Sequence, residues 1–509
     1  MHVKDQSAVK DGHAGVRGRN TRTPTLRLLL TLALSGLILG LASCGKGDHA
    51  DADGSSTSTS TSRPRPAEPI VAATPPMGWN SWNQVRCHDL DEAVVKQAAD
   101  ALVRRGLKDL GYRYVVVDDC WQAPSRDSAG ALVADPIRFP SGLESLVDYV
   151  HDKGLKFGLY LAPGSETCAM HWDDYAASGI GSYRHERQDA EMLDELGVDY
   201  LKYDWCRADE TDGLEHQKTF GLMRDELARL DRPIVYSISE YGDTKPWTWA
   251  PKVANLWRTT SDIIPFWPSV ASIIDQQAEL HSFSGPGRWN DPDMLQVGNG
   301  PLTPDETRAH IGMWAMLAAP LMIGTDLDKL TPDVIDALSN PEIIAIDQDP
   351  AGRQASRLRS GETEVWARSL ADGDMAVALL NKGDGPAEIS TTITEVGAQP
   401  GSWSIRNAST RKDLPATDGP ISEPVAPHGV TILRLSSYPP ELQAASSLVA
   451  SIMGLLSRRA AAPHPARCRV RRCRYWMWLR RQPPGWIRQV VAHRRPRRTR
   501  PRRSSPSWR

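Results

Sequence analysis

The stretch Val198-Asp199-Tyr200-Leu201-Lys202-Tyr203-Asp204-Trp205-Cys206 decides the fold class of this chain. A short apolar run, typical of a buried strand, ends abruptly in a lysine, an aspartate, a tryptophan and a cysteine. Barrels of parallel strands carry their catalytic groups at the carboxyl ends of those strands. We therefore interpret Asp204 as a candidate nucleophile at the end of a barrel strand.

Two other apolar runs end in the same way. Tyr114 to Val117 leads into Asp118-Asp119-Cys120-Trp121, and Lys156 to Leu161 ends near Tyr160. Because parallel strands have their carboxyl ends at one edge of a sheet, we expect these polar residues to share one rim.

The segment from Thr74 to about Pro350 alternates between strand patterns and helix patterns. Such alternation indicates a parallel sheet, and about eight units at a few tens of residues each fit a closed (β/α)8 barrel. An open doubly wound sheet stays possible from the period alone. Helical spacing is found in Leu90 to Leu107, Ser141 to Lys153, Tyr183 to Leu196 and Gln217 to Leu230.

The pattern changes after Pro350, where short strands alternate with Gly, Asp and Pro turns. This texture indicates an antiparallel β domain. The predicted strands are Glu364 to Arg368, Met375 to Leu380, Ala387 to Ile393 and Gly429 to Leu435.

The two ends of the chain differ from its body in charge and composition. The whole chain has 509 residues and a formal net charge of −2, but Arg458 to Arg509 holds 18 arginines and no acidic residue, which leaves −20 for the rest. A basic tail can bind nucleic acid. This tail has no helical or strand period and no recognisable module, so we predict no nucleic-acid partner. We interpret residues 438–509 as a disordered or frame-shifted appendage.

The amino end resembles a bacterial export signal. Four arginines precede the apolar run Leu28 to Leu41, which is short for a membrane span and fits a signal-peptide core. Leu41-Ala42-Ser43-Cys44 resembles a lipoprotein cleavage box, which makes Cys44 a candidate lipid anchor. A plain secretory signal is the alternative. Either way, we expect an extracytoplasmic protein that is secreted, periplasmic or attached to a bacterial membrane.

These features predict five segments: a signal peptide (1–44), a Ser/Thr/Pro-rich linker (45–72), a catalytic barrel (73–350), a β domain (351–437) and the arginine-rich tail (438–509). The barrel segment holds four cysteines, and an oxidising compartment allows them to pair. Spacing alone permits three pairings. We predict Cys87 with Cys120 and Cys168 with Cys206. No Cys-x-x-Cys pair occurs among them, which disfavours a metal site.

Five motifs in order resemble the α-galactosidases of glycoside hydrolase family twenty-seven, over about Thr74 to Leu435. The resemblance implies a (β/α)8 barrel followed by an antiparallel β-sandwich, two catalytic aspartates, a retaining mechanism and no cofactor. The motifs are Thr74-Pro75-Pro76-Met77-Gly78-Trp79-Asn80-Ser81-Trp82, Asp118-Asp119-Cys120-Trp121, Lys202-Tyr203-Asp204, Trp257-Arg258-Thr259-Thr260-Ser261-Asp262 and Gly287-Arg288-Trp289-Asn290-Asp291-Pro292-Asp293-Met294.

The resemblance assigns Asp204 as nucleophile and Asp262 as acid/base. The first must start ionised and the second protonated, so their surroundings are expected to separate their pKa values. Lys202, on the same strand face, would favour the Asp204 anion, while partial burial and a neighbouring carboxylate would suit Asp262.

By the same resemblance, the remaining site residues bind the sugar. Galactose-specific relatives place Glu-Trp at the C2 position, and this chain has Glu240-Tyr241, which would clash with an acetamido group. The full expected set is Trp82, Asp118, Asp119, Trp121, Tyr160, Lys202, Glu240, Tyr241, Arg258, Asp293 and Met294.

The leading interpretation is a retaining α-galactosidase that acts on terminal galactosyl residues of oligosaccharides or polysaccharides. The alternatives are a β-L-arabinopyranosidase, which Asp119 at the expected C6 hydroxyl disfavours, an α-N-acetylgalactosaminidase, and an inactive carbohydrate-binding barrel. The last predicts damage at Asp204 or Asp262, and both are present. Nothing in the sequence indicates an oligomeric state.

Overall fold

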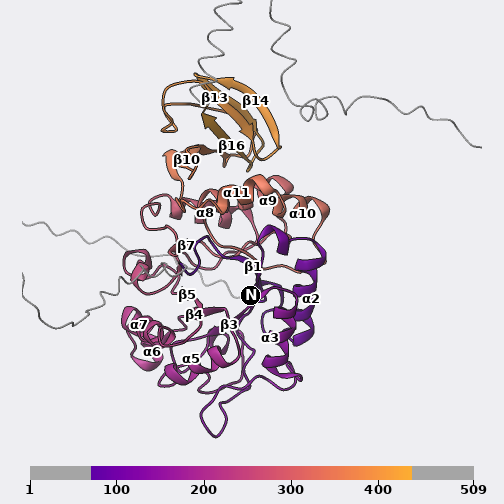
Figure 1. The fold of residues 1–509 in the computed structure, drawn as a ribbon, viewed down its shortest axis with the longest axis vertical. Coiled ribbons are helices and arrows are strands. Elements are labelled where there is room, and N and C mark those ends of the chain that lie inside the picture. Colours follow the sequence, from indigo (N-terminus) through magenta and orange to yellow (C-terminus); the bar gives the residue numbers. More distant parts are fainter. Residues whose placement is uncertain (1–69, 438–509) are drawn as a thin grey trace, which may run out of the picture. The chain divides into compact units, whose positions relative to one another are not determined.

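The computed structural model describes residues 70–437, and a sheet of eight parallel strands forms its larger part (Figure 1). The strand order is β7-β6-β5-β4-β3-β2-β1-β8. A parallel bridge between Leu295, just after β7, and Ile323 of β8 closes the sheet into a barrel, as predicted. The strands are β1 (Met77–Asn80), β2 (Tyr114–Val117), β3 (Lys156–Leu161), β4 (Tyr200–Asp204), β5 (Val235–Ser239), β6 (Leu256–Arg258), β7 (Trp289–Asp291) and β8 (Leu321–Ile323).

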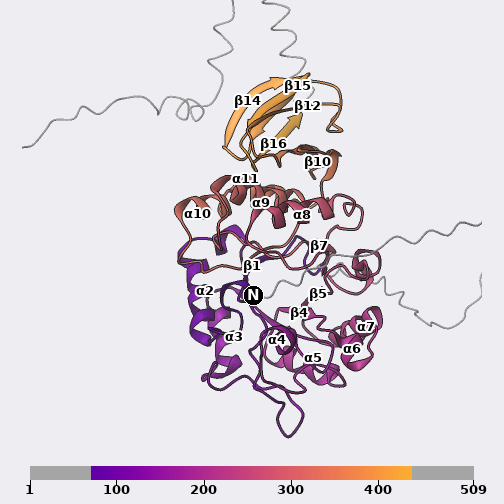
Figure 2. The same cartoon turned by 180° about the vertical axis from the view of Figure 1, so that it is seen from behind.

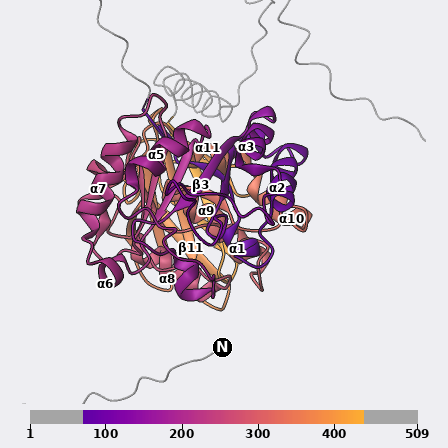
Figure 3. The same cartoon turned by 90° about the horizontal axis from the view of Figure 1, so that it is seen from below.

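Helices cover the outside of the barrel, and Figure 3 shows α2, α3, α5 and α7 around the strands. The four predicted helices are all present, with ends within a few residues of the predicted bounds. The α-helices are α1 (Trp82–Val85), α2 (Glu92–Arg104), α3 (Gly142–Asp152), α4 (Cys168–Trp172), α5 (Glu186–Glu195), α6 (Ala208–Asp212), α7 (His216–Leu227), α8 (Trp267–Gln277), α9 (Pro304–Met316), α10 (Pro332–Leu338) and α11 (Pro341–Asp347). Short 3-10 turns span Lys108–Leu110, Pro246–Thr248 and Ala250–Lys252.

The start of α2 shows why a helix begins where it does. The Asp91 side chain accepts a hydrogen bond from the backbone N–H of Val94 at 2.8 Å, which satisfies one of the free donors of the first turn. Val95 and Leu102 on the inner face are buried against the barrel. The capping residue and the apolar face together determine this helix.

The strand register brings the polar strand ends to one edge. Asp204 at the end of β4 pairs with Ser239 at the end of β5, and Arg258 at the end of β6 pairs with Asp291 of β7. The strands themselves are buried, as expected for a parallel sheet covered by helices. The carboxyl ends therefore form the shared rim that the sequence predicts.

The second part is the antiparallel β domain, which is shown from the other side in Figure 2. A six-stranded sheet, ordered β14-β13-β16-β11-β10-β9, faces the two-stranded sheet β12-β15 over an apolar core. Strands β9, β13, β14 and β15 were not predicted; β14, for example, has no buried residue and so carries no apolar pattern. The strands are β9 (Ser356–Arg359), β10 (Thr363–Ser369), β11 (Met375–Asn381), β12 (Ala387–Thr392), β13 (Trp403–Asn407), β14 (Lys412–Thr417), β15 (Pro420–Val425) and β16 (Val430–Ser437).

Within residues 70–437, no helix has the length and apolar character needed to cross a membrane. The predicted signal peptide, Cys44, most of the linker and the arginine-rich tail lie outside the described residues.

Candidate active site

A cavity of about 400 Å³ lies at the carboxyl ends of the barrel strands. Eleven of the thirteen predicted catalytic and sugar-binding residues line it, and they come from segments up to about two hundred residues apart in the chain. These eleven are Trp82, Asp118, Asp119, Tyr160, Lys202, Asp204, Tyr241, Arg258, Asp262, Asp293 and Met294.

Asp204 is 4% exposed at the end of β4, and its two carboxylate oxygens have different neighbours. Oδ1 accepts a hydrogen bond of 2.9 Å from the hydroxyl of Tyr241, and Oδ2 lies 3.5 Å from Lys202 Nζ. Burial raises the pKa of Asp204 above its usual value, and the Lys202 ammonium only partly offsets this effect.

Lys202 is held in place by Asp118. Its ammonium donates to both Asp118 oxygens, at 3.1 and 2.9 Å, and lies 5.3 Å from the centre of the Tyr160 ring. Burial opposes the charged form of Lys202, but Asp118 and Asp204 outweigh it and raise the pKa of the lysine. Lys202 is therefore a fixed positive charge beside Asp204.

Asp262 lies in the segment after β6, and its side chain is 62% exposed at the cavity. Arg258 Nη2 lies 3.0 Å from Asp262 Oδ1 and 3.1 Å from Asp293 Oδ2, so one guanidinium serves two carboxylates. Burial opposes ionisation of Asp262, but Arg258 and Lys202 outweigh it and hold the pKa of Asp262 below its usual value.

These directions correct the expectation drawn from the sequence. The pKa of Asp204 is raised and that of Asp262 is lowered, whereas the proposed roles require the opposite order. The reason is tertiary: Asp204 is buried at a strand end, while Asp262 reaches the Arg258 guanidinium four residues earlier in the chain. In this arrangement a proton shared between the two carboxyl groups therefore favours Asp204.

Asp119 and Asp293 are buried acids held by backbone donors. Asp119 accepts from the N–H groups of Ala169 and Cys120, at 2.8 and 2.7 Å, and Asp293 accepts from Ile263 at 2.8 Å. Burial raises the pKa of Asp119 to about 7. Burial likewise raises the pKa of Asp293 to about 7, against the lowering effect of Arg258.

Two predicted sugar-binding residues do not line the cavity. Trp121 is fully buried, and its indole N–H donates to the Tyr160 carbonyl at 2.8 Å, so it supports strand β3. Glu240 is 1% exposed and accepts from the Thr244 N–H at 2.8 Å. Glu240 and Tyr241 follow the end of β5, the backbone of Tyr241 is left-handed with φ of +62°, and only Tyr241 reaches the cavity.

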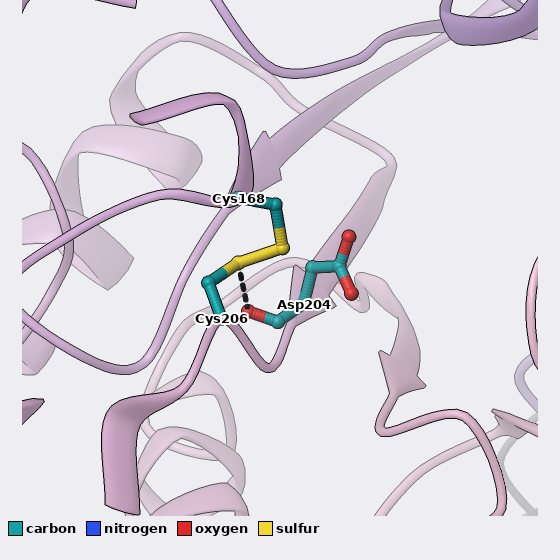
Figure 4. Close-up of side chains that lie close together, drawn as sticks. All are labelled: Cys168, Asp204 and Cys206. Atoms are coloured by element: carbon teal, nitrogen blue, oxygen red, sulfur yellow. Dashed lines mark hydrogen bonds between the residues drawn. A yellow bond between two sulfur atoms is a disulfide. The ribbon is translucent and has the colours of Figure 1, made fainter. Parts of the chain in front are cut away.

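Both predicted disulfides are present, Cys87 with Cys120 and Cys168 with Cys206. The second lies next to Asp204, as Figure 4 shows, and the Asp204 carbonyl is 3.3 Å from Cys206 Sγ. These three residues cluster like metal ligands. The two sulfurs are bonded to each other, however, so they are not the thiolates that a metal requires.

The cavity mouth contains residues that the sequence did not predict. Arg86 donates twice to Asp173, both at 2.8 Å, and its guanidinium lies 5.0 Å from the centre of the Trp82 ring. Trp172, at the end of α4, lines the mouth and is 55% exposed. The sequence held a signal for Trp172, because it lies four residues after Cys168, which was predicted to form a disulfide. The other unpredicted lining residues are Asn83, Cys168, Ile263, Ile264, Pro265, Gln296 and Asn299.

Comparisons with known proteins agree with this geometry. The family model described as alpha galactosidase A matches residues 74–349, and that described as alpha galactosidase C-terminal beta sandwich domain matches 360–435. The α-galactosidase of Cyamopsis tetragonoloba is 43% identical over 336 residues, which are 66% of this chain and 79% of the relative. Alpha-galactosidase A of Cellvibrio japonicus is 40% identical over 392 residues, covering 72% of this chain and 93% of the relative.

Solved structures show the same likeness. Alpha-galactosidase I from Mortierella vinacea superposes with a TM-score of 0.68 at 34% identity, covering 72% of this chain and 98% of that one. The α-galactosidase from Saccharomyces cerevisiae, solved with raffinose, superposes with a TM-score of 0.66 at 28% identity, with the same coverage of both chains.

Proposed function

This chain belongs to the α-galactosidase family and is a glycoside hydrolase of α-galactosides, and from this premise we propose that it releases terminal α-D-galactosyl residues with retention of configuration. The observation that carries the proposal is the meeting of Asp204 and Asp262 in one cavity, from β4 and from the segment after β6. Two carboxyl groups on one sugar are what glycoside hydrolysis needs, and retention is the part of the proposal that rests on the family. The proposed substrates are oligosaccharides or polysaccharides with α-linked galactose ends.

In the first step, an Asp204 oxygen attacks the anomeric carbon. The bond from that carbon to the leaving oxygen breaks, and Asp262 donates its proton to that oxygen. In the second step, Asp262 takes a proton from water, and the water oxygen attacks the anomeric carbon. The ester bond breaks, and its electron pair returns to the Asp204 carboxylate.

The first step needs a proton on Asp262, although the Arg258 guanidinium lowers the pKa of that carboxyl group. Arg258 can accommodate this change because it is shared with Asp293. When Asp262 is protonated, the guanidinium keeps a buried carboxylate partner 3.1 Å away. We propose that the bound sugar, by excluding water around the exposed Asp262 carboxyl, raises the pKa of Asp262 and so promotes transfer of the proton from Asp204 to Asp262.

The other cavity residues are proposed to hold the sugar. Asp118, Asp119, Lys202 and Arg258 offer charged groups for hydroxyls, and Trp82 and Met294 offer apolar surface. Trp121 is proposed to contribute without touching the sugar, because its indole N–H bonds the Tyr160 carbonyl and fixes the position of that residue. Tyr241 alone, without Glu240, would meet a C2 substituent.

The test of this proposal is the configuration of the first product. Proton NMR of an α-galactoside hydrolysis should show α-galactose before β-galactose appears by mutarotation. Initial β-galactose would overturn the retaining mechanism.

Two substitutions test the roles separately. Asp204→Asn should lower kcat by ~10³-fold or more for all substrates, because no nucleophile remains. Asp262→Asn should cost about 10²–10⁴-fold with melibiose, yet spare the first step for 2,4-dinitrophenyl α-galactoside, which leaves without a proton. Indistinguishable profiles for the two variants would contradict the assignment.

We also propose that the enzyme works outside the cytoplasm, where its two disulfides are stable. More specifically, we propose that a lipid on Cys44 attaches the enzyme to a bacterial membrane.

A further inference from the structure

The Asp204 carboxylate is held asymmetrically, and the holding group is Tyr241. The tyrosine hydroxyl donates to Oδ1 at 2.9 Å. Oδ2 lies 3.5 Å from Lys202 Nζ, but that ammonium gives its hydrogen bonds to Asp118. Among residues 70–437, Tyr241 is thus the side chain that fixes the rotation of the carboxylate and leaves Oδ2 available.

Tyr241 is itself held in an unusual position. Its backbone has φ of +62°, in the left-handed region that bulky residues rarely adopt. Its hydroxyl lies 3.5 Å from Cys168 Sγ of the disulfide, and the Arg258 guanidinium lies 5.6 Å from the ring centre. A strained backbone that aims one hydroxyl at a reacting group is typical of a functional position.

We propose that Tyr241 is a positioning residue for Asp204, which presents Oδ2 to the anomeric carbon and assists departure of the carboxylate from the glycosyl-enzyme. This inference rests on the proposed role of Asp204 as nucleophile. It gives Tyr241 a function in the reaction itself, in addition to contact with the sugar.

The two steps use the hydrogen bond differently. In the first step, Oδ2 forms the ester, the carboxylate loses its charge, and the hydrogen bond to Oδ1 weakens. In the second step, the C1–Oδ2 bond breaks, the negative charge returns, and the hydrogen bond strengthens. The hydroxyl keeps its proton throughout, because burial raises the pKa of Tyr241 well above its usual value. The greater benefit therefore falls on the second step.

Tyr241→Phe removes the hydroxyl and keeps the ring. With 2,4-dinitrophenyl α-galactoside, whose first step is fast, we expect kcat to fall about ten- to a hundredfold. KM should fall with kcat, and a burst of one dinitrophenolate per enzyme should appear. In the wild type, the hydrogen bond from Tyr241 lowers the pKa of Asp204. Its loss should raise that pKa and move the acid limb of kcat/KM to higher pH.

Tyr149→Phe is the matched control. The Tyr149 hydroxyl also bonds an aspartate, Asp100, at 3.0 Å, but on helices α2 and α3 away from the cavity. Its kinetics should equal those of the wild type. Wild-type kcat and pH profile in Tyr241→Phe would overturn the inference, as would equal falls in kcat and kcat/KM without a burst.

Peptide mapping of the trapped galactosyl ester separates this inference from the proposed function. An ester on Asp204 combined with wild-type kinetics in Tyr241→Phe would overturn only the role of Tyr241. An ester on another residue would overturn the role of Asp204 itself.

Discussion

At the level of single residues, the cavity holds more carboxyl groups than cations. Six aspartates line it, beside Arg86, Lys202 and Arg258. Glycoside cleavage passes through a transition state with positive charge on the sugar ring, which nearby carboxylates stabilise. The same crowding and burial explain why several of these acids hold their protons to unusually high pH.

Burying a carboxyl group disfavours its ionised form, and Glu240 offers a test of this effect. It is buried, does not line the cavity and has no ion-pair partner among the described residues. Burial raises the pKa of Glu240 from 4.5 to about 7. The folded state therefore binds more protons than the unfolded state over this interval, and the free energy of unfolding falls as pH rises from about 4.5 to about 7.

Glu240→Gln should remove this part of the pH dependence. The wild type should lose up to ~3 kcal/mol of stability across the interval through this residue, and the variant should be spared that loss. Thermal or urea unfolding between pH 4.5 and 8 measures it. An equally steep loss in the variant would show that Glu240 is ionised in the folded protein at pH 5.

At the level of elements, the strand ends supply the chemistry and the segments after them supply the mouth. Helix α4 begins at Cys168, whose disulfide ties it to the segment after β4. It ends at Trp172, and the next residue, Asp173, is paired with Arg86 after α1. The tryptophan is therefore fixed at both sides, with its ring left half exposed at the cavity mouth.

We predict that Trp172, which lines the cavity mouth, contacts the leaving-group sugar, and Trp172→Ala tests this. We expect kcat/KM for melibiose to fall about three- to tenfold through lost apolar contact. With α-galactosyl fluoride, whose leaving group has no ring, kcat/KM should stay unchanged.

Ile137→Ala is the control, because Ile137 is 88% exposed and does not line the cavity. It should leave both substrates unaffected. An equal loss on melibiose and the fluoride in Trp172→Ala would place the tryptophan against galactose and contradict the prediction.

At the level of the whole molecule, the β domain is packed onto the barrel through helix α9. This helix is buried on nearly all its faces, and its side chains share one core with Trp366 and Ile432 of the β domain. A helix that is buried on nearly all its faces needs packing partners on both sides. Asn340 adds a hydrogen bond of 2.9 Å to the Ala408 carbonyl across the same contact. The β domain therefore stabilises the barrel without lining the cavity.

Export and anchoring also belong to this scale. If Cys44 is lipidated, Cys44→Ser expressed in a bacterium with lipoprotein processing should move activity from the membrane fraction to the soluble extracytoplasmic fraction. The value of kcat should be unchanged, because Cys44 lies outside the catalytic barrel. Cys468→Ser, in the arginine-rich tail, is the control, and mass spectrometry of the mature amino terminus detects the lipid. Wild-type membrane association in Cys44→Ser would reject the anchor.

The sequence by itself predicted alternating strands and helices, located three strands and four helices of the barrel, and, through its family motifs, named eleven residues that line the cavity. The elements follow from local period and from the polar residues that end strands such as Tyr200–Asp204, which are features of neighbouring positions. The closed barrel and most of the site residues follow from the resemblance of five motifs to the α-galactosidase family. Both disulfides were predicted as well, although spacing permitted other pairings.

Only the tertiary structure decided how those residues face one another. The adjacent residues Glu240 and Tyr241 point in different directions. The backbone of Tyr241 is left-handed and turns its hydroxyl to Asp204, whereas Glu240 is buried outside the cavity lining. The pairing of Asp262 with Arg258 likewise reversed the expected order of the two catalytic pKa values. Which of the two carboxyl groups holds a proton depends on its burial and on charges a few ångströms away. Burial and such distances exist only in the folded chain.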